Sequence, residues 1–207
     1  MSMILSIGSL SILVHVCLFM TTTSIAQFVL DTNREPIEGD EEYFIRPVIT
    51  NNGVGRFTLV NRNGSCPLHL GLENTHFPQH SLSVKFIPFA PHHDDDDVRL
   101  NRDLRVIFQA SSSCVKSSTE WRLDEKDIRS GRRLITTGRD DGTIGSYGNF
   151  FRIVETQIAG RYNIQWCPTE VCPNCRFECG TVGFLLENEK FLLALDGSAL
   201  PVVFEKE

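Results

Sequence analysis

Hydrophobic and polar residues follow one another over short distances in most of the chain. Beyond residue 26, no apolar pattern keeps helical spacing for more than about ten residues, whereas short runs rich in β-branched and aromatic residues recur. These runs predict strands at residues 43–49, 56–60, 82–86, 104–108, 120–123, 132–136, 150–154, 161–166, 181–185, 191–195 and 202–204. Gly, Asn and Asp separate the runs, for example at Asp196-Gly197, and they tolerate the positive φ angles of tight turns. The pattern is typical of an all-β protein, either a barrel or a sandwich.

The first 26 residues have a different character. Residues 4–20 form an apolar run interrupted only by Ser, Gly and His15, and Ser24-Ile25-Ala26 supplies the small residues that a signal peptidase needs. We therefore expect a secretory signal peptide over residues 1–26 and a mature protein that begins at Gln27. An uncleaved anchor is the alternative, although a run of about 17 residues is short for a bilayer span.

Residues 27–207 have the size of one domain with a real hydrophobic core. The whole formal net charge of −6 lies in this part, with Lys and Arg scattered along it, which argues against nucleic-acid binding. Asn63-Gly64-Ser65 is an acceptor sequence for N-glycosylation, so we expect a glycan on Asn63. We also expect a monomer without a cofactor or a membrane partner, secreted to the apoplast, with the vacuole as the other destination.

The cysteine count becomes even once Cys17 is removed with the signal peptide. The six that remain are expected to form disulfides, because oxidised cysteines persist in secreted proteins; they are Cys66, Cys114, Cys167, Cys172, Cys175 and Cys179. Count and spacing leave fifteen connectivities open. A zinc site is the alternative for the last four, since Cys172-x-x-Cys175 is a common ligand pair, and a redox-active CxxC is another. Oxidation in the secretory pathway favours the disulfides over both.

Several short strings resemble a known family. Phe28-Val29-Leu30-Asp31, Pro36-Ile37 and Tyr43-Phe44-Ile45 are similar to the opening signature of the plant Kunitz-type (soybean trypsin inhibitor) family. Further similar strings follow in order at residues 66–68, 98–108, 114, 119–124, 136–138, 150–153 and 201–204. Cys167-Pro168-Thr169, with the three cysteines that follow, resembles the miraculin-like branch. Arg34 departs from the signature, which usually has Asp or Gly there, and we interpret it as a surface turn residue.

The resemblance implies a fold and a disulfide pattern. The fold is a β-trefoil of twelve short strands in three pseudo-repeats, stapled by disulfides. The implied pairs are Cys66 with Cys114, Cys167 with Cys179, and Cys172 with Cys175. We do not expect an enzyme, because the sequence has none of the common catalytic motifs. We interpret His69, His76 and His80 as surface or turn residues, and Trp121 and Trp166 as packing residues.

The resemblance also implies where function lies. The family presents an exposed loop to a serine protease as a substrate would, and in this chain that loop covers about residues 88–99. The expected reactive-site residues are Pro91, His92, His93, Asp94 and Asp95, with His93–Asp94 as the reactive bond. This stretch has no Lys or Arg, and an Asp would meet the Asp of a trypsin pocket, so a non-basic specificity follows. Arg99 could serve only if the loop were re-registered. The asparagine that braces the loop in strong inhibitors would fall at Gly39, which has no side chain.

Other functions remain open at this point. The target protease could be a cysteine protease engaged through another loop. The chain could instead be a non-inhibitory member of the family, acting in storage, defence or taste modification, or it could bind a ligand. A metal site at residues 92–97 is disfavoured, and we expect none, because successive residues on an extended strand point to opposite faces.

Overall fold

The protein's structure is a computed structural model that describes residues 27–48, 54–64, 66–74, 81–90, 96–111, 114, 118–139 and 147–207. Within these residues the chain forms thirteen strands and no helix. The strands are β1 (Tyr43–Pro47), β2 (Val54–Val60), β3 (His69–Asn74), β4 (Val84–Pro88), β5 (Asp103–Phe108), β6 (Trp121–Lys126), β7 (Arg133–Thr137), β8 (Phe151–Glu155), β9 (Tyr162–Trp166), β10 (Gly180–Thr181), β11 (Gly183–Glu187), β12 (Lys190–Ala194) and β13 (Val202–Lys206). None of the described segments could span a bilayer as an apolar helix.

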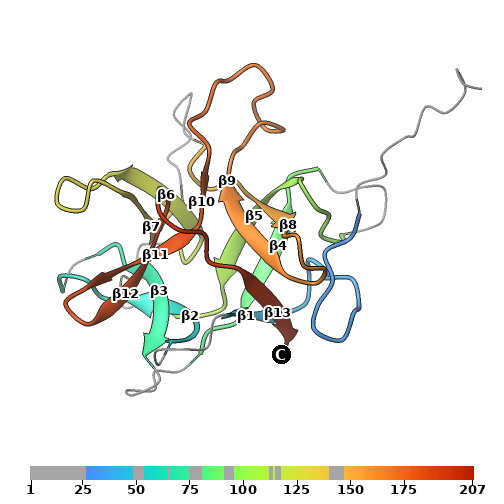
Figure 1. Cartoon of the computed structure of the whole chain (residues 1–207), viewed down its shortest axis with the longest axis horizontal. Coiled ribbons are helices and arrows are strands. Elements are labelled where there is room, and N and C mark those ends of the chain that lie inside the picture. Colours follow the sequence, from blue (N-terminus) through green and yellow to red (C-terminus); the bar gives the residue numbers. More distant parts are fainter. Residues whose placement is uncertain are drawn as a thin grey trace, which may run out of the picture.

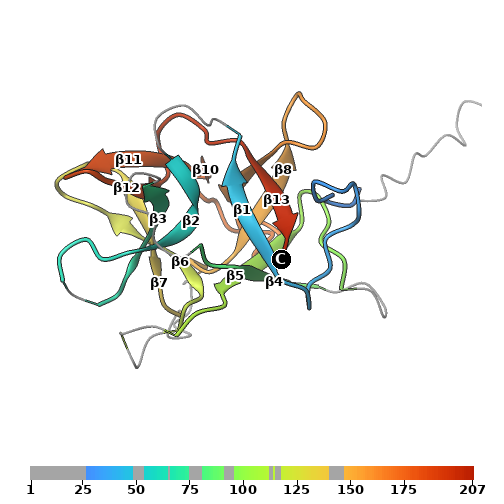
Figure 2. The same ribbon diagram turned by 90° about the horizontal axis from the view of Figure 1, so that it is seen from below.

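The strands fall into two sheets that alternate along the chain in a threefold pattern. One sheet contains β1, β4, β5, β8, β9 and β13, with the two-residue strand β10 added beside β9. The hairpins β2–β3, β6–β7 and β11–β12 form the other sheet, which we call the cap (Figures 1 and 2). A unit of strand, hairpin and strand therefore occurs three times. This is the β-trefoil arrangement, and it confirms the expected fold class.

Aromatic side chains from several strands meet in the core. Trp121, at the start of β6, is fully buried, and its ring lies 5.7–5.8 Å from three phenylalanine rings, those of Phe57 in β2, Phe108 in β5 and Phe151 in β8. Burial of apolar area at this scale is the main term that holds such a domain together. The interpretation of Trp121 as a core residue is confirmed.

Two buried tyrosines connect this core to the segment that precedes β1. The hydroxyl of Tyr43 accepts a hydrogen bond from the backbone N–H of Glu38 (3.1 Å), and that of Tyr162 accepts one from Leu30 N–H (3.0 Å). Burial raises the pKa of both tyrosines, so both remain neutral donors and acceptors at ordinary pH. The segment 27–42 is thereby fixed against the first sheet.

Arg62, directly after β2, links the three hairpins of the cap. Its guanidinium donates to Asp127 Oδ1 (2.9 Å), in the turn after β6, and to Glu187 Oε2 (2.6 Å), at the end of β11. The Arg62 side chain is only 7% exposed. Hydrogen bonds from Arg62 hold the pKa of Asp127 well below its usual range, and they lower the pKa of Glu187 as well.

Most strands lie where the apolar pattern predicts them, within a few residues, but β3 and β10 were not predicted. β3 has Gly71 at its centre, where a Cβ would lie 2.2 Å from Phe191 O and 2.4 Å from Val60 Cγ2, so this strand is selected by close backbone packing. The interpretation of His69 as a surface or turn residue is wrong, because it lies half-buried in β3, where burial lowers its pKa. His76 and His80 lie outside the described residues.

Two turn residues have the positive φ angles that the sequence predicts for turns. Arg34 is exposed in a turn with φ 68°, which confirms its interpretation as a surface turn residue, and Asp196 has φ 64°.

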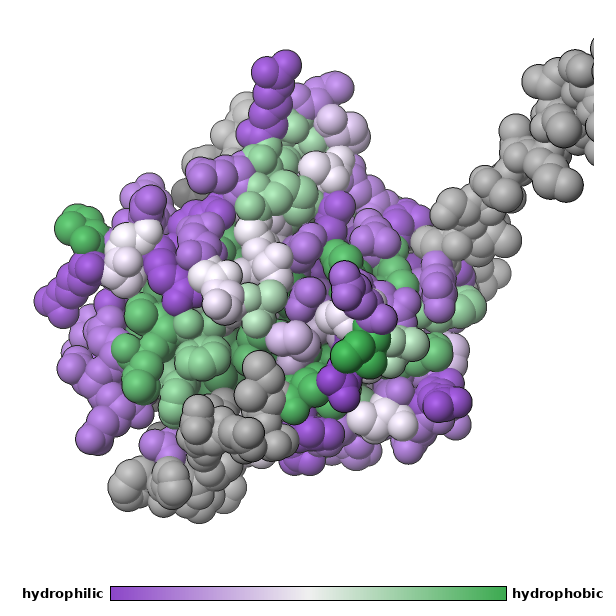
Figure 3. All heavy atoms as spheres, in the orientation of Figure 1, coloured by the Kyte–Doolittle hydropathy of each residue, from purple (hydrophilic) through white to green (hydrophobic). Residues whose placement is uncertain are grey.

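Hydrophobic residues gather over the β11–β12 hairpin in Figure 3, where Phe184 and Leu186 are exposed. This apolar surface belongs to the cap rather than to the sheet that carries the ends of the expected loop.

Replacing Trp121 by Ala is expected to lower the free energy of unfolding by about 3–5 kcal/mol, because the large cavity cannot collapse between rings held by three other strands. Urea denaturation followed by far-UV circular dichroism measures this. The Trp166→Ala variant is the control and should cost less, since Trp166 is only partly buried. A melting temperature of Trp121→Ala near that of the wild type would contradict the core assignment.

Replacing Arg62 by Met is expected to destabilise the protein by about 3 kcal/mol at neutral pH, because two partly buried carboxylates lose their counter-charge. The folded-state pKa of both carboxyls is lowered, so their stabilisation is present above the unfolded value of about 4 and disappears as the pH falls through the folded values. Between about pH 5 and pH 2 the wild type should therefore lose more stability than the variant.

The control for this experiment is Arg56→Met, since Arg56 is 35% exposed and shares Glu205 with Arg46. It should cost under about 1 kcal/mol. Equal pH dependence of wild type and Arg62→Met would show that the three-hairpin link does not contribute to stability.

Candidate functional site

The candidate site is the loop that connects β4 to β5. The expected reactive-site residues Pro91, His92, His93, Asp94 and Asp95, with the bond His93–Asp94, lie outside the described residues. The structure describes both ends of the loop, which we call its stems: residues 88–90 and residues 96–103. The geometry of the site is therefore the geometry of these two stems.

The first stem leaves the sheet at the end of β4. Pro88 pairs with Leu104, and the N–H of Phe89 donates to the backbone oxygen of Asp103 (2.8 Å). The Phe89 ring packs edge-on against Phe150 at 5.6 Å between centroids, and 44% of the residue remains exposed. This stem is thus fixed to β5 up to the point where the loop departs.

The second stem pairs with residues 27–39. Val98 is fully buried, as are its neighbours Val29 and Ile37. Four backbone hydrogen bonds hold the stem: Gly39 N–H to Asp96 O (3.1 Å), Val98 N–H to Ile37 O (2.8 Å), Val29 N–H to Val98 O (2.9 Å) and Leu100 N–H to Gln27 O (2.8 Å). The Arg99 guanidinium lies 4.3 Å from the centre of the Phe28 ring. Arg99 therefore belongs to a stem and not to the tip of the loop.

Gly39 braces the second stem through its backbone. Its N–H donates to Asp96 O, and a Cβ at this position would lie 2.9 Å from Phe86 O and 3.0 Å from Asp96 O. The sequence predicts only the loss of a bracing side chain here. The structure shows that Phe86 of β4 and Asp96 of the second stem lie against Gly39, so the space for such a side chain is already filled.

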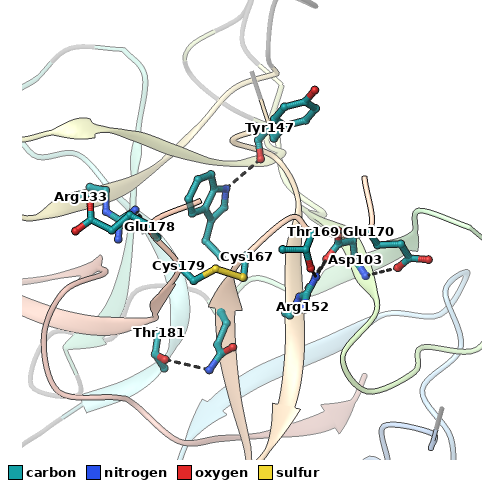
Figure 4. The surroundings of a disulfide bond; sticks show 12 residues. Asp103, Arg133, Tyr147, Arg152, Cys167, Thr169, Glu170, Glu178, Cys179 and Thr181 are labelled. Carbon is teal, nitrogen blue, oxygen red and sulfur yellow. Dashed lines mark hydrogen bonds and ion pairs between the residues drawn. A yellow bond between two sulfur atoms is a disulfide. The ribbon is translucent and has the colours of Figure 1, made fainter. Parts of the chain in front are cut away.

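Asp103, the first residue of β5, joins the stems to the segment between Cys167 and Cys179 (Figure 4). Its side chain is fully buried. The carboxylate accepts hydrogen bonds from Arg152 Nε (3.1 Å), Glu170 N–H (2.7 Å) and Val171 N–H (3.0 Å). A buried charge is tolerated when it is paired and hydrogen-bonded in this way.

The carboxylate of Glu170 in turn binds the backbone of Asp103. This carboxylate accepts a hydrogen bond from Asp103 N–H (2.9 Å) and from Arg102 Nε (2.9 Å). Burial alone would raise the pKa of Glu170, but these hydrogen bonds outweigh it and the pKa is lowered. Asp103 and Glu170 each accept a hydrogen bond from the backbone of the other residue.

The sequence does not predict the four charged residues of this contact, Arg102, Asp103, Arg152 and Glu170, as part of the site. A weak signal exists in the sequence, since Asp103 opens an apolar strand and Arg152 lies within another, and a charge on a buried strand requires a partner. The partner of Asp103 lies 67 residues away, at Glu170, so no local pattern identifies it.

Three disulfides are present among the described residues: Cys66–Cys114, Cys167–Cys179 and Cys172–Cys175. These are the pairs that the family resemblance implies. The sulfur atoms of the last four cysteines are bonded to one another, so they cannot serve as thiolate ligands for zinc. Within the described part of the chain, no three His, Cys, Asp or Glu residues gather in an arrangement suited to a metal ion.

The segment 167–179 projects from the ends of β9 and β10 (Figure 1). Phe177 packs edge-on against Trp166 (5.3 Å) and Tyr147 (5.5 Å), and Trp166 Nε1 donates to Tyr147 O (3.0 Å). Arg133 lies over the Trp166 ring and donates to Glu178 O. Trp166 is thus a packing residue, as interpreted, and the projecting segment is held by both disulfide and aromatic contacts.

Asn63, the expected glycan acceptor, is exposed.

The described residues define a β-trefoil in which both stems of the β4–β5 loop are fixed. Comparison with known families agrees with this class. The legume Kunitz family model, described as trypsin and protease inhibitor, matches residues 29–206, and the chain belongs to this family. The family model and the Medicago truncatula relatives are named as inhibitors, which indicates an inhibitor and not an enzyme.

Individual relatives cover nearly the whole chain. Kunitz type trypsin inhibitor 106 of Medicago truncatula is 73% identical over 207 residues, which is 100% of both chains. Miraculin of Synsepalum dulcificum is a more distant relative, 32% identical over 86% of this chain and 82% of its own. Among solved structures, the Kunitz-type cysteine protease inhibitor PCPI-3 from potato superposes with a TM-score of 0.72 at 25% identity, covering 88% of this chain and 98% of that one.

Replacing Gly39 by Asn is expected to loosen the second stem rather than brace it, because the added atoms meet two backbone oxygens. We expect a loss of about 1–3 kcal/mol in the free energy of unfolding and faster cleavage between residues 88 and 99 in limited proteolysis. The control is Gly131→Asn, at φ 66° with open space around the Cβ position, which should cost about 1 kcal/mol through backbone strain alone and leave the cleavage between residues 88 and 99 unchanged. A higher melting temperature and slower cleavage for Gly39→Asn would show that a side-chain brace can be restored.

Proposed function

We propose that the chain is a secreted inhibitor of serine proteases that acts through the exposed loop at residues 88–99. The observation that carries this proposal is the anchoring of both stems: Phe89 to Asp103 on one side, and Asp96, Val98 and Leu100 to the start of the mature chain on the other. A loop whose ends are already fixed loses little entropy on docking, so a small contact area can bind tightly. Family membership supports protease inhibition as the activity.

We propose a non-basic specificity for this loop, with His93–Asp94 as the reactive bond. Residues 91–95 contain no Lys or Arg, and the nearest basic residue, Arg99, is held in the second stem over Phe28. An Asp presented to the acidic base of a trypsin pocket would bring like charges together. Medicago truncatula relatives carry the name trypsin inhibitor, but for this chain a pocket that accepts His, Asp or an apolar side chain fits the sequence better.

Secretion is part of the proposal. Residues 1–26 have the composition of a signal peptide, the three disulfides suit an oxidising compartment, and Asn63 is exposed within its glycosylation sequence. We place the mature monomer in the apoplast, with the vacuole as the other destination.

The test is inhibition by purified, oxidised mature protein of trypsin, chymotrypsin, elastase, an Asp-specific subtilase and papain, with mass spectrometry to locate any cut bond. We expect tight inhibition of one serine protease other than trypsin, together with slow cleavage between His92 and Asp97. The variant His93→Arg should gain inhibition of trypsin, whereas Arg129→Ala, on the distant β6–β7 turn, should behave as the wild type.

Two other outcomes of the inhibition panel would favour a different function. Tight inhibition of papain alone would point to a cysteine protease and another loop, which is the activity named for the potato structure. Digestion by the whole panel without inhibition would reject protease inhibition and favour a storage, defence, taste-modifying or ligand-binding role.

A further inference from the structure

The buried carboxylate of Asp103 lies where both loop stems meet the Cys167–Cys179 segment. The backbone oxygen of Asp103 accepts the N–H of Phe89 from the first stem (2.8 Å), and Asp103 ends the second stem where β5 begins. Asp103 also pairs with Arg152 across the β5–β8 ladder. One residue is therefore connected to both ends of the loop and to the neighbouring strand.

Five hydrogen bonds cross between Arg102 and Asp103 on one side and Glu170 and Val171 on the other. Two run from Arg102 to the Glu170 carboxylate, one from Asp103 N–H to the same carboxylate, and two from the N–H groups of Glu170 and Val171 to the Asp103 carboxylate. Because each carboxylate binds the backbone of the other residue, the two segments cannot slide without breaking several bonds together.

The far side of this contact is itself rigid. Cys167 is bonded to Cys179, and Thr169 N–H donates to Cys167 O (2.8 Å). Thr169 Oγ1 accepts a hydrogen bond from Arg152 Nη2 (2.9 Å), the same guanidinium that binds Asp103 (Figure 4). The disulfide-closed segment therefore supports the second stem from outside.

We propose that Asp103 is a positioning residue that keeps the inhibitory loop from being consumed as a substrate. This inference rests on the proposed function. A protease that cuts the loop forms an acyl-enzyme with the new carbonyl end while the new amine end stays on the second stem. If the stem holds that amine in place, the amine attacks the acyl group and the peptide bond re-forms, with the catalytic serine as leaving group. If the stem is loose, water reaches the acyl group first and the loop is hydrolysed.

The test is Asp103→Asn in the oxidised mature protein, assayed against the protease that the wild type inhibits. The amide keeps the shape of the carboxylate but offers N–H groups to at least one donor and carries no charge for Arg152. We expect the inhibition constant and the rate of loop cleavage each to rise about tenfold or more, while hydrogen exchange of the Phe89, Glu170 and Val171 amides becomes faster.

The control is Asp127→Asn, which also separates a partly buried carboxylate from an arginine, but in the cap. It should lower the melting temperature and leave both inhibition and loop cleavage unchanged. Glu170→Gln weakens the same contact from its other side and should shift both readouts in the direction of Asp103→Asn, by a smaller factor. It serves as the second variant if Asp103→Asn does not fold.

The outcomes separate the inference from the proposed function. If the wild type inhibits a protease and the cleavage rates of Asp103→Asn and Glu170→Gln equal that of Asp127→Asn, Asp103 has a purely structural role and the inference is overturned. If the wild type inhibits no protease, the proposed function fails first, and the positioning role falls with it.

Discussion

The burial of Trp121 against rings from three other strands is the constraint on which the rest of the structure depends. Phe57, Phe108 and Phe151 reach it from β2, β5 and β8, so strands of both sheets must keep one register for the rings to meet. Strands β5 and β8 also carry Asp103 and Arg152, the pair that holds the loop stem. The aromatic core therefore fixes the position of the candidate site as well as the stability of the domain.

Charged groups then fix the parts that the apolar core does not reach. Arg62 joins the three hairpins of the cap, and Asp103 joins β5 to the Cys167–Cys179 segment. In both places one side chain binds several partners, which offsets the cost of removing it from water. The two contacts lie in different sheets, so the cap and the loop are secured independently.

The sequence predicts more of the fold than of the site. Alternation of apolar and polar residues locates most strands, because each strand buries one face against a common core. It misses β3, where Gly71 is required by a backbone approach that depends on β12. The partners of Arg62 lie 65 and 125 residues away, and no local period relates them. The loop was located by family resemblance, and Gly39 was identified as a departure, but the backbone bond that replaces the missing side chain follows only from the packed structure.

The second stem is braced by the backbone N–H of Gly39 instead of by a side chain, and this changes which contacts hold it. A bracing side chain would lose rotamer freedom each time the loop is fixed, whereas the N–H of Gly39 is already held by the pairing of Ile37 with Val98 and of Glu38 with Asp97. The brace is consequently only as firm as the attachment of segment 27–39, which relies on the hydroxyls of Tyr43 and Tyr162 and on backbone bonds that begin with Gln27 O. With cleavage after Ala26, as proposed, the pairing with Leu100 starts at Gln27, the first residue of the mature chain. If residues 1–26 are removed as proposed, the new amino terminus and the support of the second stem therefore depend on the same residue, Gln27.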